Sequence, residues 1–539
     1  MKQILTSFTA ACFVQVFSLP AFLYAVEQST PYLPQPIGLE EKAGDCGSNA
    51  PNILIILADD MGWSDLGCYG GEIQTPNLDR LADNGIRFRQ FRNTAKCMTT
   101  RASLLTGLYP QQTDMMLPKK IRNAVTLGEV LKARGYRTLW VGKHHGTENP
   151  VDRGFDRYFG LRDGACNHFN PGLQRDGEAV PARKRDDRVW CIDDKELVPY
   201  TPPNKDFYTT DAFTDTALDY LDTYRDERKP FFLYVAYTAP HDPLMAWPED
   251  IKTYDGVYDE GFEVIRNARY KKQLDLGLID GRYPLTEPTY SQWQNLSLDE
   301  RKTEALRMQV YAAMVDRMDQ NIGRILAKLD SLNELENTLI LFASDNGASA
   351  EVVHAGDNIP GNGEMGSMSR WTSQEHNWAN VSNTPFRFFK NYSHEGGINT
   401  PLIAHWPAGI SNPGRFDDFA GHFIDIMPTL LEISGAIYPA EFNGEKVLPY
   451  EGTSIVPVFK ESAVDRATPI FWQWDAGKAV INGRWKLVCW NNDPGLPEKW
   501  ELYDLEYDRT ESRDLAEEHP GVVKQLGSLY QHWLWRVAK

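Results

Sequence analysis

Cysteine is scarce in this chain. There are 7 cysteines in 539 residues, too few for a disulfide framework, so a hydrophobic core must stabilise the fold. No CxxC pair and no Cys/His zinc spacing occurs, and no zinc module is therefore indicated. Cys166 and Cys191 lie in one loop-rich stretch. A disulfide between them and two free thiols are both open alternatives.

Long apolar runs and positive charge are also scarce. Beyond the first residues, no segment reaches the roughly 18 continuous apolar residues of a membrane-spanning helix. Acidic residues outnumber basic residues, 74 against 56, and the formal charge is −18. This balance argues against nucleic acid or an anionic membrane as the main partner. A locally cationic pocket for a small anion is still compatible with it.

The amino terminus has the pattern of an export signal. Lys2 supplies a positive start, and residues 4–24 are mostly apolar or small. We predict a signal peptide over residues 1–25 and a linker over residues 26–50. A membrane anchor is the alternative, but the run is interrupted and barely long enough to span a bilayer. We expect an exported protein, periplasmic or secreted, without a stable membrane anchor.

Short apolar runs then alternate with amphipathic stretches. Runs typical of buried strands occur at residues 52–58, 138–141, 230–235, 338–343 and 402–406. Helical patterns occur between them, for example at residues 126–135 and 306–332. This alternation predicts an α/β sandwich with helices on both faces of a sheet.

The pattern changes after about residue 440. Short strand-like runs separated by turn residues occur at 470–472, 478–481, 485–490 and 500–505. They predict a small antiparallel sheet, closed by a helix over residues 522–535. We therefore predict a catalytic domain over residues 51–439 and a C-terminal subdomain over residues 440–539.

Acidic and amide side chains follow two of the predicted strands. Asp59 and Asp60 end the first strand, and Asp345 and Asn346 end another. Each pair alone fits a turn or a helix cap equally well. Adjacent carboxylates are costly unless a cation or several donors neutralise them. Together the pairs offer hard oxygen ligands suited to calcium or magnesium.

A longer motif surrounds Cys97. Arg101 and Leu105-Thr106-Gly107 follow it at fixed spacing, and this string resembles the signature of the sulfatases. In that family the first residue is oxidised to formylglycine, and the arginine holds it in place. Thr99 stands where proline or alanine is usual, and Thr100 where serine is usual. These positions help the maturation enzyme to recognise the unfolded chain.

Further motifs follow in the order of that family. They are Gly142-Lys143-His144-His145-Gly146, Ala239-Pro240-His241, and Lys390 before His394-Glu395-Gly396-Gly397-Ile398. The chain thus resembles the formylglycine-dependent (type I) sulfatases of the alkaline-phosphatase superfamily, most of all the bacterial arylsulfatases. The resemblance covers nearly the whole mature chain. It implies an alkaline-phosphatase-like sandwich with a large, mixed, mostly parallel sheet and a small C-terminal antiparallel sheet with a helix.

The resemblance also implies the cofactors. One calcium ion would be held by Asp59, Asp60, Asp345, Asn346 and an oxygen of the modified Cys97. The formylglycine would be derived from Cys97 by a maturation enzyme, which is then an obligatory partner.

The remaining motif residues acquire catalytic roles from the same resemblance. Arg101, Lys143 and Lys390 would offset charge on the sulfuryl oxygens. His241, assisted by Lys390, would protonate the leaving alcohol or phenol, and His145 would take the proton whose loss expels sulfate from the formylglycine-sulfate intermediate. An exchange of these roles among His145, His241 and Lys390 is the open alternative.

The substrate is left open between an aryl sulfate and a sulfated glycan. Candidates for the leaving-group pocket, each with a structural role as the alternative, are His144, His168, Trp371, His376 and Arg387. One rival function is a phosphonate monoester or phosphodiester hydrolase on the same scaffold. Another is a non-catalytic protein that binds sulfated ligands, which would follow if Cys97 were not oxidised.

Overall fold

The computed structural model describes residues 50–116, 119–183, 187–352, 363–462, 464–493 and 497–537. These residues belong to one compact unit. The predicted signal peptide, and the predicted linker up to residue 49, lie outside the described residues. Among the helices of the described part, none combines the length and the apolar character needed to cross a membrane.

A sheet of eleven strands runs through the described residues, in the order β10-β2-β9-β8-β1-β7-β3-β4-β5-β6 with β11 beside β2. Six of its strand pairings are parallel and four are antiparallel. The prediction of a mixed, mostly parallel sheet is therefore confirmed. The strands are β1 (Asn52–Ala58), β2 (Ile86–Arg92), β3 (Arg137–Gly142), β4 (Arg157–Leu161), β5 (Trp190–Ile192), β6 (Lys195–Leu197), β7 (Phe231–Ala236), β8 (Thr338–Ser344), β9 (Asn399–His405), β10 (Arg415–Asp417) and β11 (Gly421–His422).

Strand β1 shows why the central runs are continuously apolar. Ile53, Ile55 and Leu57 pack into one hydrophobic cluster, whereas Leu54 and Ile56 pack into another. Successive side chains of a strand point to opposite faces, so a strand covered on both faces needs apolar residues at every position.

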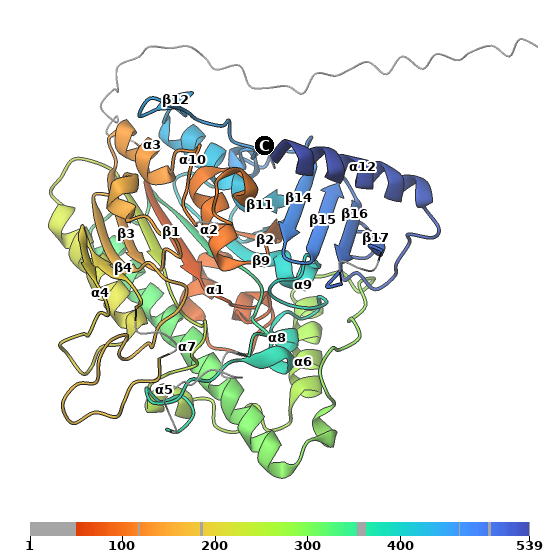
Figure 1. The fold of residues 1–539 in the computed structure, drawn as a ribbon, viewed down its shortest axis with the longest axis horizontal. Helices are drawn as coiled ribbons and strands as arrows, with labels where there is room; N and C mark the ends of the chain where they lie inside the picture. The colour runs from red at the N-terminus through yellow and green to blue at the C-terminus, as the bar shows by residue number, and fades with distance from the viewer. Residues whose placement is uncertain are drawn as a thin grey trace, which may run out of the picture. The chain divides into compact units, whose positions relative to one another are not determined.

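Helices supply both covering layers. On one face lie α1 (Pro76–Asp83), α4 (Thr209–Tyr224), α6 (Phe262–Asp275), α7 (Leu298–Ser331) and α8 (Glu375–Ser382). On the other lie α2 (Cys97–Thr106), α3 (Leu127–Arg134), α10 (Ile426–Ser434) and α11 (Val456–Phe459). Figure 1 shows α2, α3 and α10 on one side of the sheet and α4 and α7 on the other. The expected helices on both faces are confirmed.

Helix α7 begins earlier than its hydrophobic pattern predicts. Ser297 and Glu300 form a capping box, in which each side chain accepts a hydrogen bond from the other residue's backbone N–H. This cap stabilises a polar first turn that the apolar pattern from residue 306 does not reveal.

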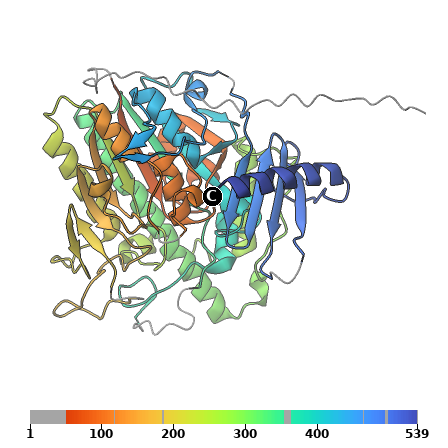
Figure 2. The same ribbon diagram turned by 45° about the horizontal axis from the view of Figure 1, so that its top comes forward.

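The C-terminal part forms the predicted small antiparallel sheet with a helix. Strands β14 (Ile470–Trp474), β15 (Gly477–Asn482), β16 (Trp485–Trp490) and β17 (Trp500–Asp504) pair in chain order. Helix α12 (Pro520–Val537) lies along one face of this sheet in both ribbon views (Figures 1 and 2). Short elements complete the fold: α5 (Pro248–Lys252), α9 (Glu395–Ile398), β12 (Glu441–Phe442) and β13 (Glu445–Lys446). The domain boundary at residues 439/440 stays a prediction.

A buried charge network joins the C-terminal sheet to the large sheet. Lys486 of β16 pairs with Glu395 of α9 at 2.8 Å and with Glu511 at 2.7 Å. Arg92, at the end of β2, pairs with the other oxygen of Glu395 at 3.1 Å. The side chains of all four residues are at most 1 % exposed. Buried charges tolerate burial only when they are paired, so the network specifies how the two sheets meet.

Disulfides play no part in the described residues. The five cysteines there, Cys68, Cys97, Cys166, Cys191 and Cys489, are all free and buried. A Cys166–Cys191 disulfide, one of the two sequence alternatives, is therefore wrong.

Candidate active site

Two strand ends meet at the centre of the site. Ala58 and Ser344, the last residues of β1 and β8, are paired in register, which brings the next residues of both strands together. Asp60 donates its backbone N–H to Asp345 Oδ1 at 3.2 Å, and Asn346 Nδ2 donates to Asp60 Oδ1 at 2.6 Å. The backbone turns sharply at Asp60, whose φ is +65°. The predicted convergence of these acidic and amide side chains is thus present in the structure.

Each of the three carboxylates has a cationic partner. The pairs are Lys143 Nζ with Asp59 Oδ2 at 2.5 Å, Lys390 Nζ with Asp60 Oδ2 at 2.7 Å, and Arg101 Nη2 with Asp345 Oδ2 at 2.8 Å. All six side chains are nearly inaccessible to solvent. The six residues come from five separate segments, so the fold, and not local sequence, assembles the charges.

Burial and neighbouring charges shift the pKa values of the acidic groups in different directions. Burial, with the nearby Asp59 carboxylate, raises the pKa of Asp345 to about 6. Burial also acts to raise the pKa of Asp60, but the neighbouring His241 ring and the charge of Lys390 outweigh it and hold that pKa well below its ordinary value. Adjacent carboxylates with separated pKa values are a feature of functional sites.

The acidic cluster retains oxygens suited to a divalent cation. Asp59 Oδ1 and Asn346 Oδ1 are buried and have no hydrogen-bond partner among the described residues. Ligand atoms of Asp59, Cys97 and Asp345 lie within 4.8 Å of one another, as do those of Asp59, Asp60 and His241. Leaving buried acceptors unpaired is costly, and hard oxygen donors match calcium or magnesium. The residues present therefore fit such an ion.

Cys97 begins helix α2 at the edge of this cluster. Its Sγ lies 3.2 Å from His145 Nδ1, and its side chain is buried, which raises the pKa of the thiol. The Thr99 hydroxyl lies 2.7 Å from Thr94 Oγ1 and donates to Lys96 O at 2.8 Å. Thr99, the departure from the family signature, thus fits the folded turn and stabilises the start of the helix.

The two motif histidines are held neutral. Burial and the charge of Lys143 lower the pKa of His145 well below its ordinary value. Burial lowers the pKa of His241 to about 3, although Asp60 opposes this shift. His241 Nδ1 donates to the Asp242 carbonyl oxygen at 2.7 Å, and its Nε2 lies 3.5 Å from Asp60 Oδ2.

Cys97, His145, His241 and Lys390 line one open cavity of 340 Å³. Asp59, Arg101, Lys143 and Asp345 are buried and do not line it. The other charged residues that line it were not predicted from the sequence: Lys96, Lys119, Arg162, Asp163, Arg188 and Glu351.

Glu351 is the most closely integrated of these additional residues. Its carboxylate pairs with Lys96 at 2.5 Å and with Lys390 at 3.1 Å. The charge of Lys390 is the main cause that holds the pKa of Glu351 far below its usual range. Lys96 directly precedes Cys97, and Glu351 lies on the loop after Asp345, so proximity to the motifs was the available signal.

The five leaving-group candidates are scattered. Of these five residues, all of them described, only Trp371 lines the cavity that contains Cys97. His376 is exposed, and Arg387 hydrogen-bonds to side chains of β17. His168 is buried under His241, whose carbonyl oxygen lies 3.1 Å from its Nε2. His144 is buried against an aromatic ring, with neither ring nitrogen hydrogen-bonded in the described part of the chain.

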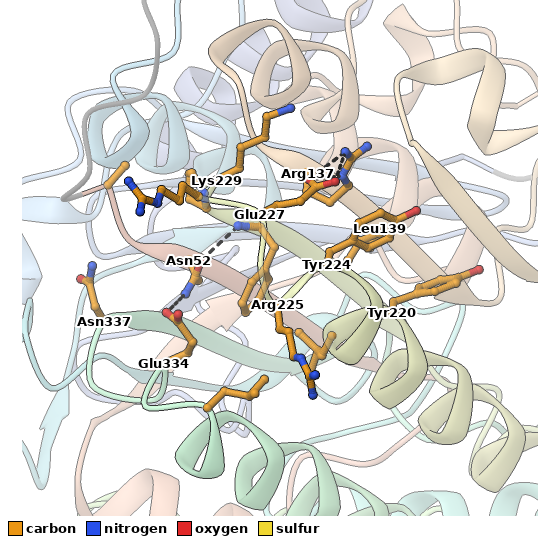
Figure 3. A pocket seen from close by; sticks show the side chains of 16 residues that line it. Asn52, Arg137, Leu139, Tyr220, Tyr224, Arg225, Glu227, Lys229, Glu334 and Asn337 are labelled. Carbon is orange, nitrogen blue, oxygen red and sulfur yellow. Dashed lines mark hydrogen bonds and ion pairs between the residues drawn. The ribbon is translucent and has the colours of Figure 1, made fainter.

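A second cavity, of 350 Å³, is lined by the side chains drawn in Figure 3 and lies at the amino ends of the central strands, opposite to the candidate site. It is lined by the first residues of β1, β3 and β7 and by the segment before β8. Its polar groups are largely satisfied: Arg137 pairs with Glu227 at 2.8 Å, and Asn52 donates to Glu334 at 2.8 Å. With no cysteine, serine, threonine or histidine in its lining, this cavity is no candidate for the reaction.

Comparison with known proteins identifies the family. The model of the family described as Sulfatase matches residues 51–436. The chain belongs to the sulfatase family. A second model, described as N-sulphoglucosamine sulphohydrolase, C-terminal, matches residues 385–530. This sulfatase is therefore a hydrolase of sulfate esters, with the alkaline-phosphatase-like fold of its structural neighbours.

Relatives and solved structures agree with this identification. The sulfatase is 33 % identical over 536 residues to an uncharacterized sulfatase of Schizosaccharomyces pombe, covering 90 % of this chain and 93 % of that protein. It is 33 % identical over 436 residues to an arylsulfatase of Klebsiella aerogenes, covering 75 % and 91 %. The crystal structure of Ps i-CgsB in complex with k-i-k-neocarrahexaose has a TM-score of 0.64 at 25 % identity and covers 90 % of this chain and 93 % of that chain.

Proposed function

We propose that this sulfatase cleaves an aryl or carbohydrate sulfate ester with a formylglycine made from Cys97, assisted by one calcium ion. The position of Cys97 carries the proposal. Its Sγ lies 3.2 Å from His145 Nδ1 and within 4.8 Å of carboxylate oxygens of Asp59 and Asp345. A nucleophile derived from this residue would have a proton acceptor on one side and metal ligands on the other.

Asp59, Asp60, Asp345 and Asn346 would hold the calcium ion, together with an oxygen of the modified Cys97. When bound, calcium supplies positive charge that offsets the charge of the sulfuryl oxygens. Hydrated formylglycine would supply two hydroxyl groups on one carbon, one for attack on sulfur and the other for the release of sulfate.

Three fixed cations surround the place where negative charge develops. Arg101, Lys143 and Lys390 are each held by a buried carboxylate, so they need not reorganise during the reaction. Arg101 is further fixed by donating to the Lys143 carbonyl oxygen at 2.9 Å. Preorganised charge of this kind stabilises a transition state more effectively than mobile charge.

The two histidines are proposed to have different roles, one as a proton acceptor and the other as a proton donor. His145 is neutral beside Cys97 and is suited to take a proton from the nucleophile's second hydroxyl group. Asp345, which has a carboxylate oxygen within 4.8 Å of Cys97 Sγ, would assist the attack as a base. His241 would acquire its Nε2 proton when the anionic ester enters, because negative charge nearby raises the pKa of histidine, and would then protonate the leaving oxygen.

Two further parts of the proposal concern the maturation of the enzyme and its location. Cys97 is only 1 % exposed, so the maturation enzyme must reach it before this segment folds. Export through the segment at residues 1–25 would place the folded enzyme in the periplasm or outside the cell.

The names of two relatives support the substrate range. One relative is an arylsulfatase, and a solved structure of similar fold holds a neocarrahexaose. An aryl sulfate and a sulfated saccharide are therefore both proposed as substrate classes.

Mass spectrometry of the peptide that contains Cys97 tests the proposal. The full chain is produced with a formylglycine-generating enzyme, and the mass expected on replacing the CH₂SH side chain by an aldehyde is sought and confirmed with a hydrazide probe. The peptide with Cys489 serves as an unmodified reference. Hydrolysis of 4-nitrophenyl sulfate, of sulfated monosaccharides and of a phenylphosphonate ester is measured on the same sample. An intact thiol at Cys97 would contradict the proposal and favour a protein that only binds sulfated ligands.

A further inference from the structure

The two faces of the C-terminal sheet have different partners. Successive side chains of a strand point to opposite faces, and on one face Phe471 of β14 packs against α12. On the other face Trp472 belongs to one buried cluster with Ala95 and Ile398, which lie next to β2 and β9. Ala95 is two residues before Cys97, so this face of the sheet lies against the segment that leads to the reaction centre.

Two tryptophans of β14 donate hydrogen bonds across this contact. Trp472 Nε1 donates to the backbone oxygen of Asn93 at 2.6 Å, and Trp474 Nε1 donates to Asn391 Oδ1 at 3.0 Å. Asn93 lies in the segment between β2 and α2, and Asn391 directly follows Lys390. Each indole N–H therefore holds one of the two segments that carry the proposed nucleophile and one of the proposed cations.

The two segments are also bonded directly to each other. The backbone N–H of Asn391 donates to Ala95 O at 2.9 Å. Both residues have left-handed backbone conformations, with φ of +65° at Ala95 and +79° at Asn391. Asparagine adopts this conformation readily, whereas alanine keeps it only where the surrounding structure enforces it. Ala95 is inaccessible to solvent and packs in the cluster of Trp472, so the C-terminal sheet helps to enforce it.

A third tryptophan of the C-terminal part shows that packing does not require these hydrogen bonds. Trp533 of α12 covers the other face of the sheet and is stacked on Phe471, with ring centroids 5.0 Å apart. Its Nε1 is buried and has no hydrogen-bond partner within the described residues. A tryptophan here can thus fill the core without a partner, whereas Trp472 and Trp474 each donate the N–H to a segment of the candidate site.

We propose that Trp472 and Trp474 are positioning residues for the reaction. Their indole N–H groups fix the segment before Cys97 and the segment of Lys390 relative to each other, so that nucleophile and cation meet the same sulfuryl group. This inference rests on the proposed function, since it uses the roles given there to Cys97 and Lys390. Such positioning matters because a displacement of about 1 Å can slow a reaction about 10²-fold.

Removal of the N–H groups alone tests the inference. Benzothienylalanine, in which sulfur replaces the indole N–H, is incorporated into the full chain in place of Trp472 or Trp474, and Trp472→Phe and Trp474→Phe are made beside it. The same replacements at Trp533 are the matched control, because its N–H has no partner to lose. Formylglycine content, kcat and KM with the preferred sulfate ester, and hydrogen exchange of peptides that cover residues 93–96 and 388–394 are measured for each protein.

Benzothienylalanine at either position is expected to lower kcat per formylglycine by about tenfold to a hundredfold with KM nearly unchanged, and to speed hydrogen exchange in both segments. The replacements at Trp533 should change neither quantity in this way. Unchanged exchange, or faster exchange with unchanged kcat, would overturn the inference. A loss of kcat with phenylalanine but not with benzothienylalanine would assign the effect to ring size and would also overturn it. If the unmodified enzyme hydrolysed no sulfate ester, the proposed function would fail, whereas faster exchange would still support the positioning of the two segments.

Discussion

At the scale of single residues, one hydrogen bond decides the state of His241. A carbonyl oxygen only accepts, so the bond to Asp242 O places the proton of the neutral ring on Nδ1. Nε2 is then free to receive a second proton, or to bind a cation with Asp59 and Asp60. The two roles make different predictions.

If His241 is the proton donor, His241→Asn should slow the hydrolysis of sugar sulfates by about 10²–10⁴-fold in kcat. The effect on 4-nitrophenyl sulfate should be much smaller, because nitrophenolate leaves without a proton. His376→Asn, at an exposed histidine, is the control and should alter neither rate. Equal losses on both esters would show that His241 acts on the metal or on ester binding instead.

At the scale of elements, the network of Arg92, Glu395, Lys486 and Glu511 holds the C-terminal sheet against the catalytic loops. Glu395 follows the segment of Lys390, and Asn391 there accepts a hydrogen bond from Trp474 Nε1 of β14 at 3.0 Å. The C-terminal sheet therefore helps to position the segment of Lys390, for which we propose a catalytic role. The packing of the C-terminal sheet against this segment should weaken at acidic pH.

Burial acts to raise the pKa of Glu395, but Arg92 and Lys486 lower it to about 2. Its ordinary value is 4.5, so its stabilising contribution is complete above pH 4.5 and is lost as the pH falls towards 2. The difference between these two pKa values corresponds to about 3 kcal/mol in the free energy of unfolding. In urea unfolding, Glu395→Gln should be less stable than the unmodified chain near neutral pH, and the difference should shrink below pH 4.5. The exposed Glu517→Gln is the control. A difference independent of pH would contradict the assignment.

The limits of sequence-based prediction are also visible among the elements. Strands β1, β7 and β8 are recognisable because both faces are buried and all their central positions are apolar. Strand β2 was not predicted: Arg87 and Arg89 interrupt its apolar residues, and a register shift between Phe88 and Phe91 disrupts its alternation.

The site residues likewise divide into those that the sequence predicts and those that it does not. Residues at strand ends, such as Asp59 and Asp345, were predictable because parallel strands end at one edge of a sheet. Lys119 and Arg162 were not, since they are brought together by hydrogen bonds between distant loops, in which Thr147 donates to Lys119 O and accepts from the Arg162 side chain. Such long-range contacts leave no periodic signal in the sequence.

At the scale of the whole molecule, an acidic protein must attract an anionic substrate. The three inner carboxylates are balanced by Arg101, Lys143 and Lys390, so the centre is nearly neutral without a metal. A bound calcium ion would make it cationic by two charges. Calcium should thus be needed both for catalysis and for the stability of the place where the two strand ends meet.

Calcium is therefore expected to raise the unfolding temperature of the chelator-treated protein, because a ligand that binds only the folded state stabilises it. At a hundredfold excess over Kd the gain is about 2.7 kcal/mol. Differential scanning calorimetry with and without calcium measures it independently of activity. Asp59→Asn should abolish the response, since it removes a carboxylate of the cluster. Asp319→Asn should preserve it, because this buried carboxylate binds the backbone N–H groups of Asn77 and Leu78 elsewhere in the fold. If calcium did not change the unfolding temperature of the unmodified chain, the acidic cluster would be stabilised by its three cations alone.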